Sequence, residues 1–104
     1  MNKVCLIGRI STDIELKATE SGKTVLSFNL AVDRGYGDNK TTDFIPCVIW
    51  NEYAESMSKN LVKGQQIGVE GNLKPYTFDD KNGTKHYPMD VVVERITFTG
   101  KKNA

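Results

Sequence analysis

One short stretch alternates between two kinds of side chain along its whole length, and this alternation constrains the fold more than any other feature. Its apolar positions are Leu26, Phe28, Leu30 and Val32, and its small or polar positions are Ser27, Asn29, Ala31 and Asp33. A period of two residues predicts a β-strand with one face in the core. The sequence has 104 residues, which suits one domain whose core needs neither a metal nor a disulfide.

Two further segments are expected to be strands with apolar side chains on both faces. Residues 4–7 are apolar at every position, so one face is expected in the core and the other against a second subunit or another strand. In residues 43–50, one face carries Ile45, Cys47 and Ile49, and the opposite face carries Phe44, Pro46, Val48 and Trp50. The even spacing of Phe44 and Trp50 places both on one face, about 20 Å apart.

The segment after residue 50 has the pattern of a short amphipathic helix. Asn51 is a suitable N-cap, and Gly64 is a suitable stop. Lys59 and Lys63 would complement the helix dipole in the last turn. The expected buried stripe consists of Ala54, Met57 and Leu61.

Two long strands are expected after the helix. The first begins near Gln66 and continues through Phe78, with inward side chains at Ile67, Val69 and Leu73. Residues 79–83 contain Asn-Gly, the strongest hairpin signal in the chain, and the last strand spans residues 85–98 with Pro88 at an edge or bulge. Three strands, a helix and two strands predict an all-β chain that forms a small closed barrel, in which Gly68 and Gly71 permit the bend.

Charge and composition exclude several classes of protein. The net charge is +1, so a surface for a polyanion would need its basic side chains gathered on one face, with acids elsewhere. No stretch is long and apolar enough to cross a bilayer, and residues 1–8 lack the pattern of a signal peptide. Cys5 and Cys47 lie in apolar runs without metal-ligand spacing, which indicates buried free thiols in a reducing cytoplasm.

Several aromatic side chains are expected outside the core, interspersed with lysines. Phe44 and Trp50 share one strand face, and Tyr36 lies in the polar loop before that strand. Another outward face carries Lys74, Tyr76 and Phe78. Aromatic rings stack on unpaired bases at about 1–3 kcal/mol per base, and lysines neutralise phosphates. The pattern therefore suggests a surface for single-stranded nucleic acid, although packing of Phe44, Val48 or Trp50 against a neighbouring element fits the periodicity as well.

The sequence offers no arrangement suited to catalysis, a metal or a cofactor. Residues 35–37 do not have the spacing of a phosphate-binding loop. His86 is the only histidine and has no ligand-like spacing, so we interpret it as a strand residue, with a phosphate contact as the alternative. Asp79 and Asp80 are adjacent and point apart. We therefore predict no enzymatic activity, no cofactor and no metal.

Several motifs, in the same order along the chain, resemble the single-stranded DNA-binding proteins of bacteria and phages. They cover residues 2–9, the stretch from Asp43 to Trp50 with Ala54 and Glu55, residues 61–64, residues 69–73, and residues 81–87 and 91–93. The resemblance extends from Asn2 to about Gly100. It implies a five-stranded OB-fold Greek-key barrel with the helix between its third and fourth strands, over residues 1–100.

The resemblance also implies a function and a set of contact residues. The family coats single-stranded DNA during replication, recombination and repair, as a homo-oligomer in which a tetramer is favoured over a dimer. Its stacking aromatics would correspond to Tyr36, Phe44, Trp50 and Phe78. Its phosphate contacts would correspond to Lys3, Lys63 and Lys74, to which this sequence adds Arg9 and Arg34. The alternative is an OB-fold adaptor of the primosome or another protein-interaction type, with DNA binding secondary.

The C-terminus departs from the family pattern. Relatives add a flexible tail with an acidic tip that recruits other proteins, whereas residues 101–104 are Lys-Lys-Asn-Ala, short and basic. Tail-mediated recruitment is therefore not expected for this sequence. A compact form from a phage or mobile element and a longer protein that has been shortened both fit this end.

Overall fold

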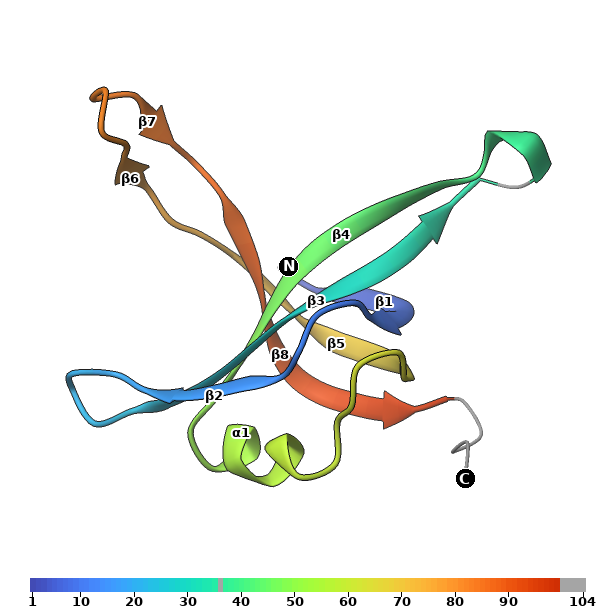
Figure 1. The fold of residues 1–104 in the computed structure, drawn as a ribbon, viewed down its shortest axis with the longest axis horizontal. Helices are drawn as coiled ribbons and strands as arrows, with labels where there is room; N and C mark the ends of the chain where they lie inside the picture. The colour runs from blue at the N-terminus through green and yellow to red at the C-terminus, as the bar shows by residue number, and fades with distance from the viewer. Residues whose placement is uncertain (36, 100–104) are drawn as a thin grey trace.

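The computed structural model describes residues 1–35 and 37–99, which form ten short elements. In chain order they are β1 (Val4–Ile10), β2 (Glu15–Ala18), β3 (Thr24–Arg34), the 3-10 helix η1 (Gly37–Asn39), β4 (Thr41–Trp50), α1 (Asn51–Ser58), β5 (Gln66–Pro75), β6 (Phe78–Asp79), β7 (Lys85–His86) and β8 (Met89–Phe98). Figure 1 shows the long strands crossing one another at the centre of the molecule, with α1 below them.

Five of the strands close into a barrel. The sheet order is β1-β5-β8-β4-β3-β2, and β1 also pairs with β3 through Arg9 with Ala31 and Ile10 with Leu30. Strands β4 and β8 are parallel, whereas every other pairing in this sheet is antiparallel. A closed five-stranded Greek-key barrel with a helix between its third and fourth strands is an OB fold, so the predicted fold class is confirmed.

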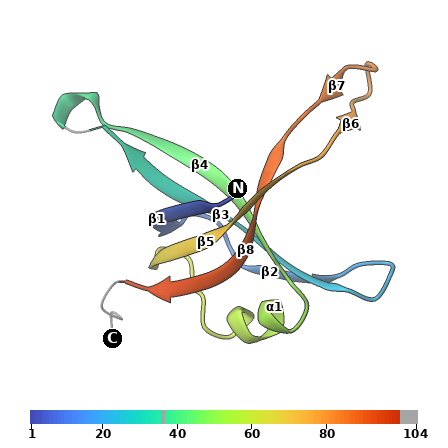
Figure 2. The same cartoon turned by 180° about the vertical axis from the view of Figure 1, so that it is seen from behind.

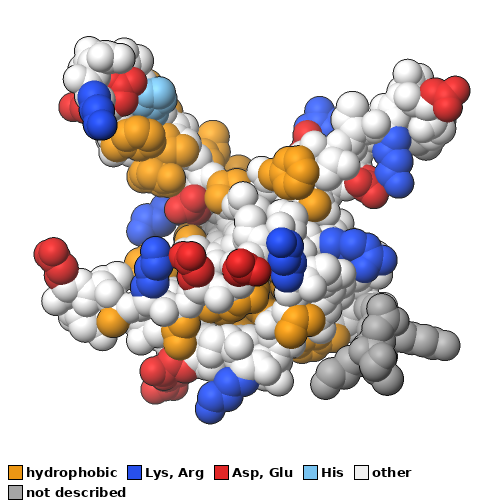
Figure 3. All heavy atoms as spheres, in the orientation of Figure 1, with side chains coloured by type: hydrophobic (Ala, Val, Ile, Leu, Met, Phe, Trp, Pro, Cys, Tyr) orange, Lys and Arg blue, Asp and Glu red, His pale blue; other side chains and the backbone are white. Residues whose placement is uncertain are grey.

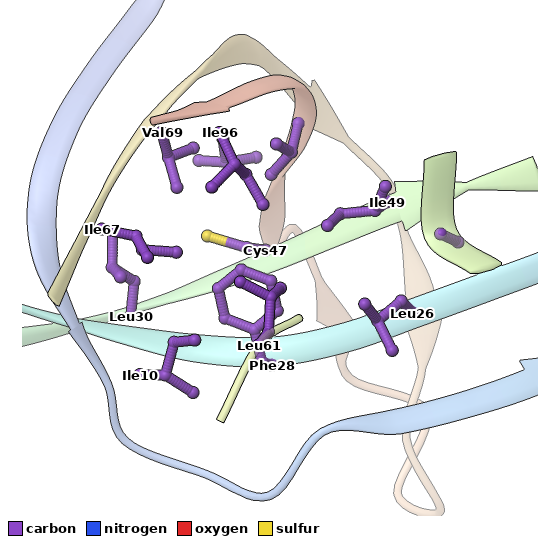
Figure 4. Close-up of a cluster of buried hydrophobic side chains, with 13 residues drawn as sticks. Ile10, Leu26, Phe28, Leu30, Cys47, Ile49, Leu61, Ile67, Val69 and Ile96 are labelled. Atoms are coloured by element: carbon purple, nitrogen blue, oxygen red, sulfur yellow. The ribbon is translucent and has the colours of Figure 1, made fainter. Parts of the chain in front are cut away.

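The barrel interior is filled by the side chains that the alternating patterns placed inward. Figure 4 shows residues from β3, β4 and β5 converging with Ile10 and Ile96, and Leu61 joins them from the segment after α1. Leu26, Phe28, Leu30, Cys47, Ile49, Ile67 and Val69 are all buried, as predicted. Ala54 is buried as well, and Met57 packs against this core. The core therefore fixes which side of β3 and β4 faces outward.

The helix is shorter than the sequence suggested. It ends at Ser58, so Lys59 is its C-cap residue and Lys63 lies beyond it. Asn51 does not act as the predicted side-chain cap; it takes a φ of 60°, a left-handed conformation that asparagine tolerates better than most residues. Leu61 still reaches the core, because the backbone N–H groups of Asn60 and Leu61 both donate to the Met57 carbonyl and turn the chain inward. Gly64 has a positive φ in the following turn and is not the helix stop.

Four other expectations differ from the structure. The hairpin of β2 with β3 was not predicted. Leu73 was predicted inward, but 39% of its surface is exposed because β5 and β8 extend beyond the barrel there. Cys5 was predicted to be buried and is exposed. The last strand was predicted to be continuous, with Pro88 at an edge or bulge, but it is divided at Tyr87-Pro88 into β7 and β8.

Candidate nucleic-acid interface

Two ribbons project from the same side of the barrel, away from α1. One is the outer part of β3 and β4, and the other is the extension of β5 and β8 that ends in the β6–β7 hairpin (Figures 1 and 2). The space-filling view in Figure 3 shows a wide gap between these two ribbons, with hydrophobic side chains gathered on the β6–β7 ribbon. The structure therefore offers two separated platforms on one side of the molecule.

The outer face of β4 carries Phe44, Pro46, Val48 and Trp50, as the spacing predicted. Phe44 is 61% exposed, whereas Trp50 is half-buried. Register pairs Phe44 with Ala31, which in turn pairs with Arg9, so Phe44 and Arg9 are the two register partners of one residue of β3. Trp50 pairs with Val25, which pairs with Lys17 of β2. At each end of this face, a basic residue thus lies two strands away from the aromatic residue.

The second ribbon continues the same outer surface of the sheet. Val48 pairs with Val92, and Val92 pairs with Asn72, so the outer face of β4 is continuous with that of β5. Beyond Asn72, every residue from Leu73 to Asp79 is exposed, and Lys74, Tyr76 and Phe78 are among them. The outer face of β4 is therefore continuous with β5 as far as Lys74, and Tyr76 and Phe78 follow on the ribbon beyond it.

A groove of about 560 Å³ crosses this surface between the β1–β2 loop and Tyr76. Pro46 and Val48 line it together with three acidic residues, Asp13, Glu15 and Asp90. Partial burial raises the pKa of Asp90, and the nearby charge of Lys74 acts in the opposite direction. Negative charge in the groove repels phosphate, so bases rather than phosphates are suited to occupy it.

The predicted basic residues differ in whether other groups of the protein already bind their charged ends. Arg34 is tied to Asp43, whose Oδ2 atom lies 2.9 Å from both Nε and Nη2 of the guanidinium. Since Asp43 is adjacent to Phe44 in the strand, this ion pair lies on the opposite face of the ribbon. Arg9 donates from Nη1 to the carbonyl of Gly64 at 3.1 Å, which brings it beside the loop that contains the exposed Lys63.

The remaining predicted contacts are Lys3 and Tyr36. Lys3 is exposed and precedes β1, next to Asn2, whose amide exchanges two hydrogen bonds with the backbone of Leu73. Tyr36 lies outside the described residues. Basic and acidic side chains are mixed on the face shown in Figure 3, so the expected separation of charge is not found there.

Sequence reasoning missed two features of this surface. His86 stacks on Phe78, with ring centroids 4.8 Å apart, and the register of the hairpin that produces this contact was not read from the sequence. Lys17 was missed because β2 itself was not predicted; it forms a 3.2 Å ion pair with Glu15. Among the residues that the structure describes, no helix is long and apolar enough to span a membrane.

The barrel, its groove and its outward aromatic residues define the class of OB-fold proteins that bind oligomers on the outer sheet face. The Single-strand binding protein family model matches residues 1–99, and the chain belongs to that family. Single-stranded DNA-binding protein 3 of Clostridium acetobutylicum is 44% identical over 101 residues, covering 94% of this chain and 70% of the relative. The single-stranded DNA-binding protein of Caldanaerobacter subterraneus is 38% identical over 106 residues, covering 99% of this chain and 71% of the relative.

Proposed function

We propose that this protein binds single-stranded DNA without reading its sequence. Bases stack on the exposed aromatic rings of the two ribbons, and lysine and arginine side chains neutralise phosphates. The observation that carries the proposal is the exposure of Phe44 and Phe78, 61% and 48%, on two ribbons that project from the same side of the barrel (Figure 1). Large aromatic rings held in solvent on a rigid sheet are costly unless a partner covers them.

The biological role follows from this binding mode. A protein that covers bases without chemistry would protect exposed strands in replication, recombination and repair. It would need no cofactor and no metal. We place it in the cytoplasm, where the free thiols of Cys5 and Cys47 would stay reduced.

The direct test compares single-stranded and duplex oligonucleotides of one length and sequence, by fluorescence anisotropy. Single strands should bind far more tightly, because paired bases do not present their faces to aromatic rings. Trp50 is the only tryptophan, so quenching of its emission by oligothymidine would report a base at that position. Equal affinity for the duplex would contradict the proposal.

Two variants separate binding from folding. Phe44→Ala should weaken binding by about 1–3 kcal/mol at little cost in stability, because the ring is exposed. Trp50→Ala should weaken binding similarly and also lower stability, since its ring is half-buried. Val62→Ala is the matched control: Val62 is also 61% exposed, but it lies in the α1–β5 loop, and its truncation should leave the affinity unchanged.

We further propose that the protein is a homo-oligomer, a tetramer in preference to a dimer. The outer face of β1 exposes Cys5 and Ile7, and Ile7 is 61% exposed opposite Gly68. A shallow apolar groove of about 320 Å³ lies on this face, between residues of β1, β5 and Thr97 of β8. An exposed apolar face of this kind on a small domain favours self-association. Light scattering at micromolar concentration should give a multiple of 11.6 kDa, and a monomer mass would contradict the proposal.

A further inference from the structure

Three rings follow one another along the β6–β7 ribbon. Tyr76 and Phe78 are stacked with centroids 6.4 Å apart, and Phe78 and His86 are stacked with centroids 4.8 Å apart and planes 12° apart. The second contact arises because His86 is the register partner of Phe78 across the hairpin. All three residues are exposed, so the imidazole is the terminal member of an aromatic platform in solvent.

One carboxylate fixes the orientation of the imidazole. The Oδ2 atom of Asp80 lies 2.9 Å from Nε2 of His86. The other oxygen, Oδ1, accepts the backbone N–H groups of Asn82 and Thr84 at 2.8 and 2.9 Å, which anchors the carboxylate in the turn. These contacts, first the one from His86, lower the pKa of Asp80. Asp80 is therefore an ionised acceptor, and Nε2 of His86 carries a proton facing it.

We propose that His86 is a further single-stranded DNA contact, which extends the stacking platform in both charge states and donates from Nδ1 to a phosphate only when it is protonated. The inference rests on the proposed function. Because Nε2 is already a donor to Asp80, the proton that the ring gains at low pH goes to Nδ1. That nitrogen is an acceptor in the neutral ring, which does not bind phosphate oxygen, and a donor in the imidazolium.

The charges around His86 set the direction of the effect. Asp80 is the charged group that faces the ring, so the pair carries one negative charge when the imidazole is neutral and none when it is protonated. Asp79 and Lys85 form the adjacent register pair, which the alternation of the strands places on the other face of the hairpin, and Lys81 lies in the turn. A bound polyanion favours the protonated ring, so affinity should rise as pH falls.

The single histidine permits a direct measurement. The imidazole proton resonance of the full chain is titrated by NMR with and without oligothymidine. DNA should raise the midpoint of this titration by about 0.3–0.7 pH units, which corresponds to binding about two- to fivefold tighter at pH 5.5 than at pH 8. The slope of log K against log salt should also be steeper by about 0.7 at the lower pH.

Two substitutions separate the stacking role from the charged role. His86→Phe keeps a ring against Phe78 but removes Nδ1, so affinity at about pH 8 should stay within about twofold while the pH dependence disappears. His86→Ala should weaken binding at both pH values. A pH dependence that survives in His86→Phe would overturn the proposal, as would an unmoved histidine titration in a chain that binds DNA. A chain that does not bind oligothymidine at any pH would instead refute the proposed function.

Discussion

The backbone carbonyl of Val92 occupies the position where a Cβ atom of residue 71 would lie, so only glycine fits at Gly71. The contact lies next to the register shift between Glu70 and Gly71, where β5 and β8 bend to close the barrel. Gly71→Ala should therefore lower the free energy of unfolding by about 2–4 kcal/mol, because backbone rather than a flexible side chain must move. Urea denaturation would measure the loss.

Gly68 provides the control in the same strand. A Cβ atom there would meet the side chains of Thr99 and Thr97 at 3.5 and 3.7 Å, an ordinary contact distance. Gly68→Ala should change the stability by less than about 1 kcal/mol at the same protein concentration. Equal losses in the two variants would show that the Val92 contact does not constrain β5.

The hydroxyl of Tyr53 connects α1 to the barrel wall. It accepts a 2.7 Å hydrogen bond from the backbone N–H of Ile96, a residue whose side chain is in the core. Tyr53→Phe removes the acceptor and keeps the ring, so the N–H loses its partner at a cost of about 1–3 kcal/mol in stability. Thermal and urea unfolding would measure it. The same change at Tyr87, which is 67% exposed, should have no measurable effect, and a similar loss there would contradict this account.

The basic residues should differ in their contribution to the salt dependence of binding. The guanidinium of Arg34 is neutralised by Asp43, whereas Lys74 is exposed near the end of β5, in the ribbon that leads to Tyr76 and Phe78. Lys74→Gln should reduce the slope of log K against log salt by about 0.7, the contribution of one phosphate on a single strand. Arg34→Gln should leave the slope unchanged. Titrations at several salt concentrations would decide, and the reverse ranking would place the DNA path across the other face of the β3–β4 ribbon.

The sequence was sufficient to predict the barrel because the core strands alternate. Leu26, Phe28 and Leu30 on β3 are buried where a period of two placed them, and the same spacing put Phe44 on the outer face of β4. Strand β2 gave no such signal, since all four of its residues are exposed and its only partner is β3. Its pairing depends on the hairpin with β3 and not on burial.

The sequence prediction failed at positions where the local pattern was correct but the surrounding fold changed the outcome. By strand alternation Leu73 lies on the inward face of β5, and it pairs with the buried Val91. It is exposed because it lies at the rim of the barrel, where no core side chains cover it. The Asn-Gly signal located the last hairpin but not its register. Hydrogen bonds between Asp80 and Thr84 close the turn over residues 80–84, one residue later than the predicted turn over residues 79–83. That shift places His86 opposite Phe78.

The thiol of Cys47 should make stability depend on pH in the alkaline range. Burial, and secondarily the charge of Asp90, raises the pKa of Cys47 from 9.0 to about 12. The folded chain therefore keeps a proton that the unfolded chain releases above about pH 9, so stability is lost as pH rises from about 9 towards 12.

A comparison with Cys47→Ala isolates this effect from the titration of lysines and tyrosines. At about pH 8 the variant should be less stable than the natural chain, because it leaves a cavity. At about pH 10.5 the difference should shrink by about 1–2 kcal/mol, since the variant has no thiol for its unfolded state to ionise. Urea denaturation at both pH values measures the two chains, and a gap that stays constant for Cys47→Ala would mean that the thiol ionises as readily in the folded barrel as in the unfolded chain.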